Sequence, residues 1–322
     1  MKRLFLFLSL IAILLVVASC SNNSNKGPKS TKWRDTLTSG AIYIASDQCF
    51  EPVIQAQVAV FESQYLEAGI VPIFTGEMET IRLLMDDSVR LAVVSRELTE
   101  REKAVFTSKN MVVRELKIAT DAIALIVNKS NEESMIGMPT LKKILTGEIT
   151  EWKQINPKSK LGKIDVIFDN PNSGTVRYAI DSITGGQGLS DKLYAQENNL
   201  QAIEMVSKIP GALGIIGVNW ISNENDSTNL SFNDKIKVLA VSRYASPDQY
   251  NSYLPFQAYV VYSNYPMIRS VYILLSDPKN GLSTGFASFV TSDRGQRIIL
   301  KSGLVPATMP INIVNVHDRY PN

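Results

Sequence analysis

The stretch AIYIASDQCFEP, residues 41–52, passes from a short apolar run through a polar loop into a helix start. The run AIYIA is hydrophobic and partly β-branched, as a buried parallel strand would be. Pro52 suits the first turn of a helix, because the N–H group that proline lacks would have no partner there. The stretch therefore predicts one strand–loop–helix unit, with its polar loop at the carboxyl end of the strand.

The same unit recurs twice in the next part of the chain. Strand-like runs at 70–74 and 91–94 are each followed by a polar loop and then by a helical pattern. The loops after these two strands are Thr75-Gly76-Glu77 and Ser95-Arg96. Strand, loop and helix in repetition predict a parallel sheet, whose loops lie at the edge where such sheets bind ligands.

A fourth loop of this kind lies in the second half, within FDNPNSGTVRY at 168–178. Ser173-Gly174-Thr175 places two hydroxyls and several free N–H groups at a helix start. Such groups cap the helix, or they hold an anion where the ends of other elements converge on them. The strand side of the loop offers Asp169 and no arginine, so the loop by itself leaves both interpretations open.

The N-terminus has the plan of a secretory signal, with Lys2-Arg3 followed by an almost unbroken apolar run over 4–17. The small residues before Cys20 resemble the lipobox of bacterial lipoproteins, in which that cysteine is lipidated. The alternative is an ordinary signal peptide with a chance cysteine. We expect a signal peptide at 1–19, a flexible tether at 20–32, and a lipid anchor that holds the protein in the cell envelope, on the periplasmic or extracellular face of a bacterial membrane.

The composition argues against several functions. The chain has 33 basic and 31 acidic residues, and loss of the signal peptide leaves 31 of each, so no nucleic-acid partner is expected. The single histidine, His317, stands near the C-terminus, which leaves little basis for a Ser–His or Cys–His nucleophile or a Cys/His metal cluster. We therefore expect no enzymatic activity, no metal and no cofactor. Cys49 is either a thiolate at a helix start or, more commonly, a small packing residue.

Taken together, these units resemble the phosphate-binding lipoproteins of phosphate-specific ABC transporters, which have the type 2 periplasmic binding-protein fold. The resemblance runs from about Ser39 to Pro306. The stretches that carry it are IASDQCFEP, RLAVVSRELTEREK, TLKKILTGEITEW, DNPNSGTVRY, GALGIIG and the C-terminal block YPMIRSVYILLSDPKNGLSTGFASFVTSDRGQRIILKSGLVP.

The resemblance implies an α/β protein of two lobes, each a mixed, mostly parallel sheet flanked by helices, with the ligand cleft between the lobes. Lobe one is expected at 33–120 plus 258–322, and lobe two at 121–257. The chain is expected to cross between the lobes through hinge strands at Ala122–Asn128 and Gln257–Ser263. Closure about such a hinge buries the ligand, which helix N-termini hold.

The resemblance also implies a set of ligand-binding residues, carried over by position. They are Asp47, Cys49, Phe50, Glu77, Ser95, Arg96, Asp169, Ser173, Gly174 and Thr175. Three depart from the family pattern: Cys49 stands where Thr is frequent, Glu77 where an anion-binding Ser is usual, and Asp169 where many members have their main phosphate-binding Arg. A buried acid can accept the proton of monohydrogen phosphate, but several acids together repel the dianion unless Arg96 or Arg177 compensates.

The implied function is the capture of inorganic phosphate by a lipid-anchored solute-binding protein, which hands it to an ABC permease and ATPase complex. Two alternatives stay open. The same fold could bind another oxyanion, or a polar solute whose cationic group pairs with the acids. The chain could also be a lipoprotein outside transport, with a role in sensing or in the cell envelope.

Overall fold

The computed structural model describes residues 35–191, 193–222 and 231–309. These residues belong to one compact unit that begins at Asp35. The expected signal peptide, tether and lipidated Cys20 lie outside the described residues. Within the described ranges, no helix combines the length and the apolar character that a membrane span requires.

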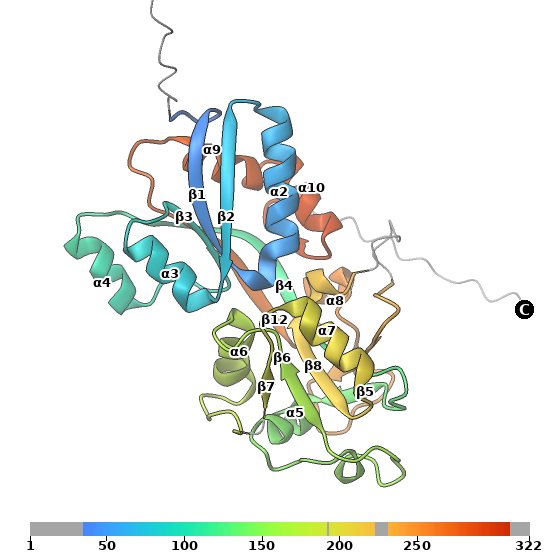
Figure 1. Ribbon diagram of the computed structural model, residues 1–322. Helices are drawn as coiled ribbons and strands as arrows, with labels where there is room; N and C mark the ends of the chain where they lie inside the picture. Colours follow the sequence, from blue (N-terminus) through green and yellow to red (C-terminus); the bar gives the residue numbers. More distant parts are fainter. Residues whose placement is uncertain (1–34, 192, 223–230, 310–322) are drawn as a thin grey trace, which may run out of the picture. The chain divides into compact units, whose positions relative to one another are not determined.

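The first half of the fold is built from the three strand–loop–helix units that the sequence predicts. The strands are β1 (Gly40–Asp47), β2 (Ala68–Thr75) and β3 (Leu91–Val94), and the helices that follow them are α2 (Glu51–Gln64), α3 (Glu77–Met85) and α4 (Glu100–Ser108). The three strands lie parallel in the order β2-β1-β3. Parallel pairing brings the three loops to the same edge of the sheet (Figure 1).

Each of these helices begins for a local reason. Pro52 occupies the first turn of α2, where no N–H group is needed. Thr99 and Glu102 form a capping box at α4, in which each side chain binds the backbone N–H of the other residue. Glu77 is the first residue of α3, where a negative charge is favoured by the helix dipole. The polar loops are therefore fixed by helix starts as well as by strand ends.

Two long antiparallel strands continue the sheet beyond β3. β12 (Ile268–Leu275) lies beside β3, and β4 (Arg114–Val127) lies beside β12. β4 contains most of the expected hinge segment Ala122–Asn128 and begins well before it. The sheet then continues through β8 (Ala212–Gly217), β6 (Asp165–Phe168) and β7 (Tyr194–Ala195). Figure 1 shows β4 and β12 side by side between the first three strands and β8.

The expected hinge strand at Gln257–Ser263 is wrong, because residues Gln257–Val261 form the helix α8. The run is rich in β-branched and aromatic residues, which favours a strand in isolation. In the structure only one face of it is covered: Val260 is buried, and Gln257 anchors the helix start by donating to two main-chain carbonyls. The second strand that joins the two halves of the sheet is β12.

The second half of the fold contains the loop of the sequence FDNPNSGTVRY. β6 leads through this loop into α6 (Gly174–Tyr178), which continues as a π-helical turn at Ala179–Ile183. The remaining strands are β5 (Met135–Gly137), β9 (Lys237–Val238), β10 (Ala240–Ser242), β11 (Ser252–Tyr253) and β13 (Val305–Pro306), and the remaining helices are α5 (Met138–Leu145), α7 (Asn199–Lys208), α9 (Leu282–Thr291) and α10 (Asp293–Lys301).

Buried apolar side chains gather in separate clusters on the two halves of the sheet. β4 contributes to both halves: Ile118 and Ala119 pack in a cluster with β1 and β3, while residues 122–127 pack in the cluster around β6 and β8. Asp121 lies between these two sets and is fully buried. Asp121, the one charged residue in the stretch 118–127 of β4, thus marks where the chain passes from one core to the other.

Candidate functional site

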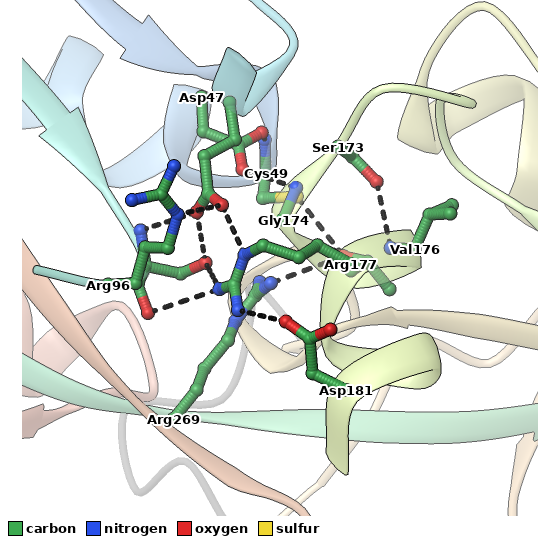
Figure 2. A network of polar contacts seen from close by, with 12 residues as sticks. Asp47, Cys49, Arg96, Ser173, Gly174, Val176, Arg177, Asp181 and Arg269 are labelled. Atoms are coloured by element: carbon green, nitrogen blue, oxygen red, sulfur yellow. Dashed lines mark hydrogen bonds and ion pairs between the residues drawn. The ribbon is translucent and has the colours of Figure 1, made fainter. Parts of the chain in front are cut away.

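Loops from both halves of the sheet meet at Gly174, the first residue of α6. A Cβ atom built on Gly174 would come closer than 3.0 Å to Ser95 Oγ, Asp47 Oδ2 and Glu77 Oε2. A side chain at this position would therefore displace at least one of these three side chains. The structure therefore brings the loops after β1, β2 and β3 onto the start of α6, and Figure 2 shows the resulting network of polar contacts.

Asp47 is fully buried and joins the loop after β1 to α6. Its Oδ1 accepts the N–H group of Cys49 at 3.1 Å, and its Oδ2 accepts the N–H group of Gly174 at 2.8 Å. Burial, together with the negative charge of Glu77, raises the pKa of Asp47 to about 7, although the positive charge of Arg269 opposes the rise. The Gly174 N–H group at the helix start thus holds a carboxylate oxygen.

Glu77 is the second carboxylate at this junction, by which we mean the place where the loops after β1, β2 and β3 meet the start of α6. Its Oε2 accepts the N–H group of Ser95 at 2.9 Å and the Ser95 hydroxyl at 2.5 Å. Its Oε1 accepts Nε–H of Arg177 from α6, and Nε of Arg96 lies 3.5 Å away. Burial favours a higher pKa, but Arg177 and the hydrogen bonds from Ser95 hold the pKa of Glu77 below its usual value. Glu77 is therefore an ionised carboxylate surrounded by donors.

Arg96 faces the junction only in part. Its two terminal nitrogens donate to the carboxylate of Glu102, both at 2.8 Å. Burial of Glu102 opposes ionisation, but Arg96 and the cap contacts of Thr99 lower the pKa of Glu102 to about 2. Most of the positive charge of Arg96 is thus matched by Glu102, and Arg177 is the guanidinium that binds Glu77 directly.

Asp169 is fully buried, and its carboxylate is bound mainly by its own loop. Oδ1 accepts the hydroxyl of Ser173 at 2.7 Å and the N–H group of Asn170 at 2.9 Å. Oδ2 accepts the hydroxyl of Thr175 at 3.2 Å and lies 3.0 Å from Cys49 Sγ. Asp169 therefore orders the loop Ser173-Gly174-Thr175.

The loop Ser173-Gly174-Thr175 combines both interpretations that the sequence left open. Ser173 Oγ accepts the N–H group of Val176 at 3.3 Å, which caps α6. The neighbouring Gly174 N–H group is free of this cap and binds Asp47. The loop is thus a helix cap that also donates to an anionic oxygen.

Cys49 and Phe50 lie beneath the junction, both fully buried. Burial and nearby carboxylates raise the pKa of the Cys49 thiol well above its usual value, so the residue packs as a neutral thiol. Its carbonyl accepts Nδ2–H of Asn219 at 3.0 Å and Nε1–H of Trp220 at 2.8 Å. Asn219 and Trp220 therefore bind the loop after β1.

Arg269 and Asp121 reach the same region from the two long strands. Nε of Arg269 donates to Oδ2 of Asp121 at 2.8 Å, and Nη1 approaches the hydroxyl of Thr175 at 3.4 Å. The guanidinium lies 5.1 Å from the centre of the Phe50 ring. Nη2 of Arg269 is buried and has no hydrogen-bond partner among the described residues. Burial opposes ionisation, but the negative charges of Asp121 and Asp47 raise the pKa of Arg269 above its usual value.

Sequence reasoning missed Arg269, Asp121 and Asn219, although a signal was present for two of them. Arg269 is the one charged residue in the run 268–275, and Asp121 is the one charged residue in the run 118–127. A charge inside an apolar strand is rarely buried without a partner. The pairing itself depends on the register of β12 against β4, which places Arg269 opposite Asp121.

Solved structures with the same fold confirm the expected α/β architecture. One is a phosphate ABC transporter substrate-binding protein with bound phosphate from Clostridium perfringens, with a TM-score of 0.69, 22% identity, and coverage of 83% of this chain and 100% of that chain. Another is an ABC-type phosphate transport receptor from Vibrio cholerae, with a TM-score of 0.62, 21% identity and the same coverage.

Relatives in sequence match nearly the whole chain. The phosphate-binding protein PstS of Bacillus subtilis (strain 168) is 23% identical over 314 residues, which cover 95% of this chain and 95% of the relative. The protein of the same name from Staphylococcus aureus (strain USA300) is 21% identical over 297 residues, which cover 92% of this chain and 85% of the relative. The family model for the PBP superfamily domain matches residues 34–294, and the chain therefore belongs to the PBP superfamily.

Proposed function

We propose that this chain is an extracytoplasmic solute-binding protein that captures inorganic phosphate and delivers it to the permease and ATPase of an ABC importer. Its sequence relatives are named phosphate-binding proteins, and the similar structure from Clostridium perfringens contains bound phosphate. The proposed binding place is the junction of the two halves of the sheet, where Ser95, Gly174 and Arg177 provide hydrogen-bond donors.

One observation carries this proposal: the donors of the junction converge on anionic oxygens. Gly174 donates its N–H group to Asp47, while Ser95 and Arg177 donate to Glu77. Main-chain N–H groups at a helix start, hydroxyls and guanidinium groups are the donors that bind phosphate in proteins. The carboxylate oxygens occupy positions of the kind that phosphate oxygens take in such a site.

The two-lobed division remains part of the proposal, with lobe one at 33–120 plus 258–322 and lobe two at 121–257. The passage of β4 from one core to the other supports a crossing near Asp121. Val260 and Tyr265 pack in the core around β6 and β8, which favours a return crossing at β12, later in the chain than the expected boundary at residue 258. A hinge in β4 and β12 would open the junction and admit the ligand.

Calorimetric titration of the chain from Ser21 onward with phosphate, arsenate and sulfate tests the ligand. Phosphate and arsenate are expected to bind and to raise Tm, and sulfate is expected to bind more weakly because it carries no proton for a buried acid to accept. No heat with millimolar phosphate, together with an unchanged Tm, would exclude phosphate. Binding of sulfate in preference to phosphate would indicate a different oxyanion.

Lipid anchoring at Cys20 is a separate part of the proposal, supported by the sequence before that residue. A strain that expresses the full chain is expected to incorporate labelled palmitate into the protein and to retain it in the membrane fraction. The Cys20→Ser variant is expected to lose the label. Equal labelling of both proteins would contradict the anchor.

A further inference from the structure

We propose that Glu77 is a tethered anion: its carboxylate binds the donors that the site would offer to phosphate, and phosphate must displace it to bind. The inference rests on the proposed function for the identity of the competing ligand. The contact between Glu77 and Arg177 also joins α3 to α6, so it holds the two halves of the site together.

Both oxygens of the Glu77 carboxylate are bound by donors of the kinds that hold oxyanions. Oε2 accepts both the N–H group and the hydroxyl of Ser95. Oε1 accepts Nε–H of Arg177, with Nε of Arg96 at 3.5 Å. The side chain is 1% exposed, so these donors are bound inside the junction and not at its rim. An incoming phosphate group would need the same donors.

The junction is closely packed around Gly174. A Cβ atom on Gly174 would lie closer than 3.0 Å to Glu77 Oε2 and to Asp47 Oδ2. Gly76, the residue before Glu77, approaches Asn172 so closely that a Cβ atom would lie 2.7 Å from Asn172 Cβ. Phosphate that binds the donors of Ser95 and Arg177 would take the place of the Glu77 carboxylate, so Glu77 must leave Ser95 first.

Electrostatic repulsion also favours replacement of Glu77 by phosphate over binding of phosphate beside it. Asp47 and Glu77 both face Gly174, and a dianion placed beside them would be repelled. Arg96 offsets little of this repulsion, because Glu102 binds both of its terminal nitrogens. If phosphate replaces the Glu77 carboxylate, the donors of Ser95 and Arg177 keep an anionic partner. If phosphate is added while Glu77 stays, the two anions repel each other and compete for the same donors.

In the proposed exchange, Glu77, the first residue of α3, leaves Ser95 and Arg177 by rotation of its side chain. The observed association constant for phosphate is then that of the vacated donors multiplied by the fraction of the protein in which Glu77 has left them.

Calorimetric titration of phosphate into variants of the chain from Ser21 onward, which retains the compact unit beginning at Asp35, tests the competition. Glu77→Ser restores the residue usual in the resembled family and is expected to bind phosphate at least tenfold more tightly than the wild type. Glu77→Gln keeps the side-chain length without the charge and is expected to gain less. Glu79→Ser removes an exposed carboxylate from the same helix and is expected to change nothing. Where the wild type binds phosphate, an affinity of Glu77→Ser at or below that of the wild type overturns the proposal.

Small-angle X-ray scattering in phosphate-free buffer separates this result from the proposed function. The wild type is expected to be compact, and Glu77→Ser is expected to be more extended until phosphate is added. If neither protein binds phosphate while Glu77→Ser is still extended, the tethered anion stands and the phosphate proposal fails. If the wild type binds phosphate and Glu77→Ser is neither extended nor tighter in binding, the function stands and the tethered anion fails. A thermal melt shows whether each variant is folded. If Glu77→Ser does not fold, the titration and the scattering are measured on Glu77→Gln instead.

Discussion

Arg269 and Asp121 form an ion pair between neighbouring strands, with Nε 2.8 Å from Oδ2 and the two side chains 2% and 0% exposed. The two residues are directly opposite in the register of β12 against β4. They lie where β4 passes from one apolar core to the other. An ion pair at this point neutralises two charges in the strands that join the halves of the sheet, and Nη1 of Arg269 also approaches Thr175 at the start of α6.

Removal of one partner from this pair is expected to destabilise the fold strongly. Asp121→Asn or Arg269→Met leaves an uncompensated buried charge, which costs about 3–5 kcal/mol of unfolding free energy. Urea denaturation measures the change. Asp293→Asn breaks the exposed pair with Arg297, in which both side chains are 69% exposed, and is the matched control with little expected change. Similar losses in the buried and exposed pairs would contradict this prediction.

Most loops of the site could be predicted from the sequence because their signals are local. An apolar run followed by polar residues and a helical pattern marks the ends of β1, β2, β3 and β6. The same rule failed at Gln257–Val261, where β-branched residues favoured a strand and tertiary packing of one face selected a helix. The secondary-structure propensity of a segment does not indicate which of its faces other parts of the chain will bury.

The roles of the acids could not be predicted, because they depend on contacts between distant parts of the chain. Position in the loop suggested that Asp169 contacts the ligand, yet its carboxylate is bound within its own loop and by Cys49. Glu77 was expected among the ligand-binding residues, and its partner Arg177 comes from the other half of the sheet. The sequence indicated that an arginine must compensate the acids, but only the geometry of the junction shows that Arg177 is the one that binds Glu77.

Stability is expected to depend on the protonation of Asp47. Its pKa is about 7 in the folded chain against 3.8 for a free side chain, so the folded state binds this proton more tightly. The contribution is therefore present at low pH and is lost as pH rises from about 4 to 7, by at most about 1.4 kcal/mol per pH unit. The free energy of unfolding of the wild type, minus that of Asp47→Asn, should fall across this window in urea titrations. A difference that is constant or that increases with pH would refute the assignment.

Cys49 is expected to react slowly with thiol reagents. It is the one cysteine of the chain from Ser21 onward, and its thiol is buried between Asp169 and Thr175 with a raised pKa. Little thiolate is present at neutral pH, so its reaction with a maleimide should be roughly a hundredfold slower than that of an exposed cysteine. Ser63→Cys in a Cys49→Ala background provides the exposed reference. Comparable rates for the two thiols in native buffer would show that the junction opens readily.

Arg177 and Arg96 are expected to differ sharply in their importance for phosphate, although both lie close to Glu77. Arg177→Met removes the guanidinium that binds an anionic oxygen directly, and loss of one charge-assisted hydrogen bond weakens phosphate binding by roughly ten- to hundredfold. Arg96→Met is expected to weaken it less, because both terminal nitrogens of Arg96 already bind Glu102. Arg82→Met removes an exposed arginine from α3 and serves as the control in calorimetric titrations of phosphate. Equal losses for Arg177→Met and Arg96→Met would contradict this prediction and would indicate that Arg96 binds phosphate, either through Nε, which lies 3.5 Å from Glu77 Oε1, or by leaving Glu102.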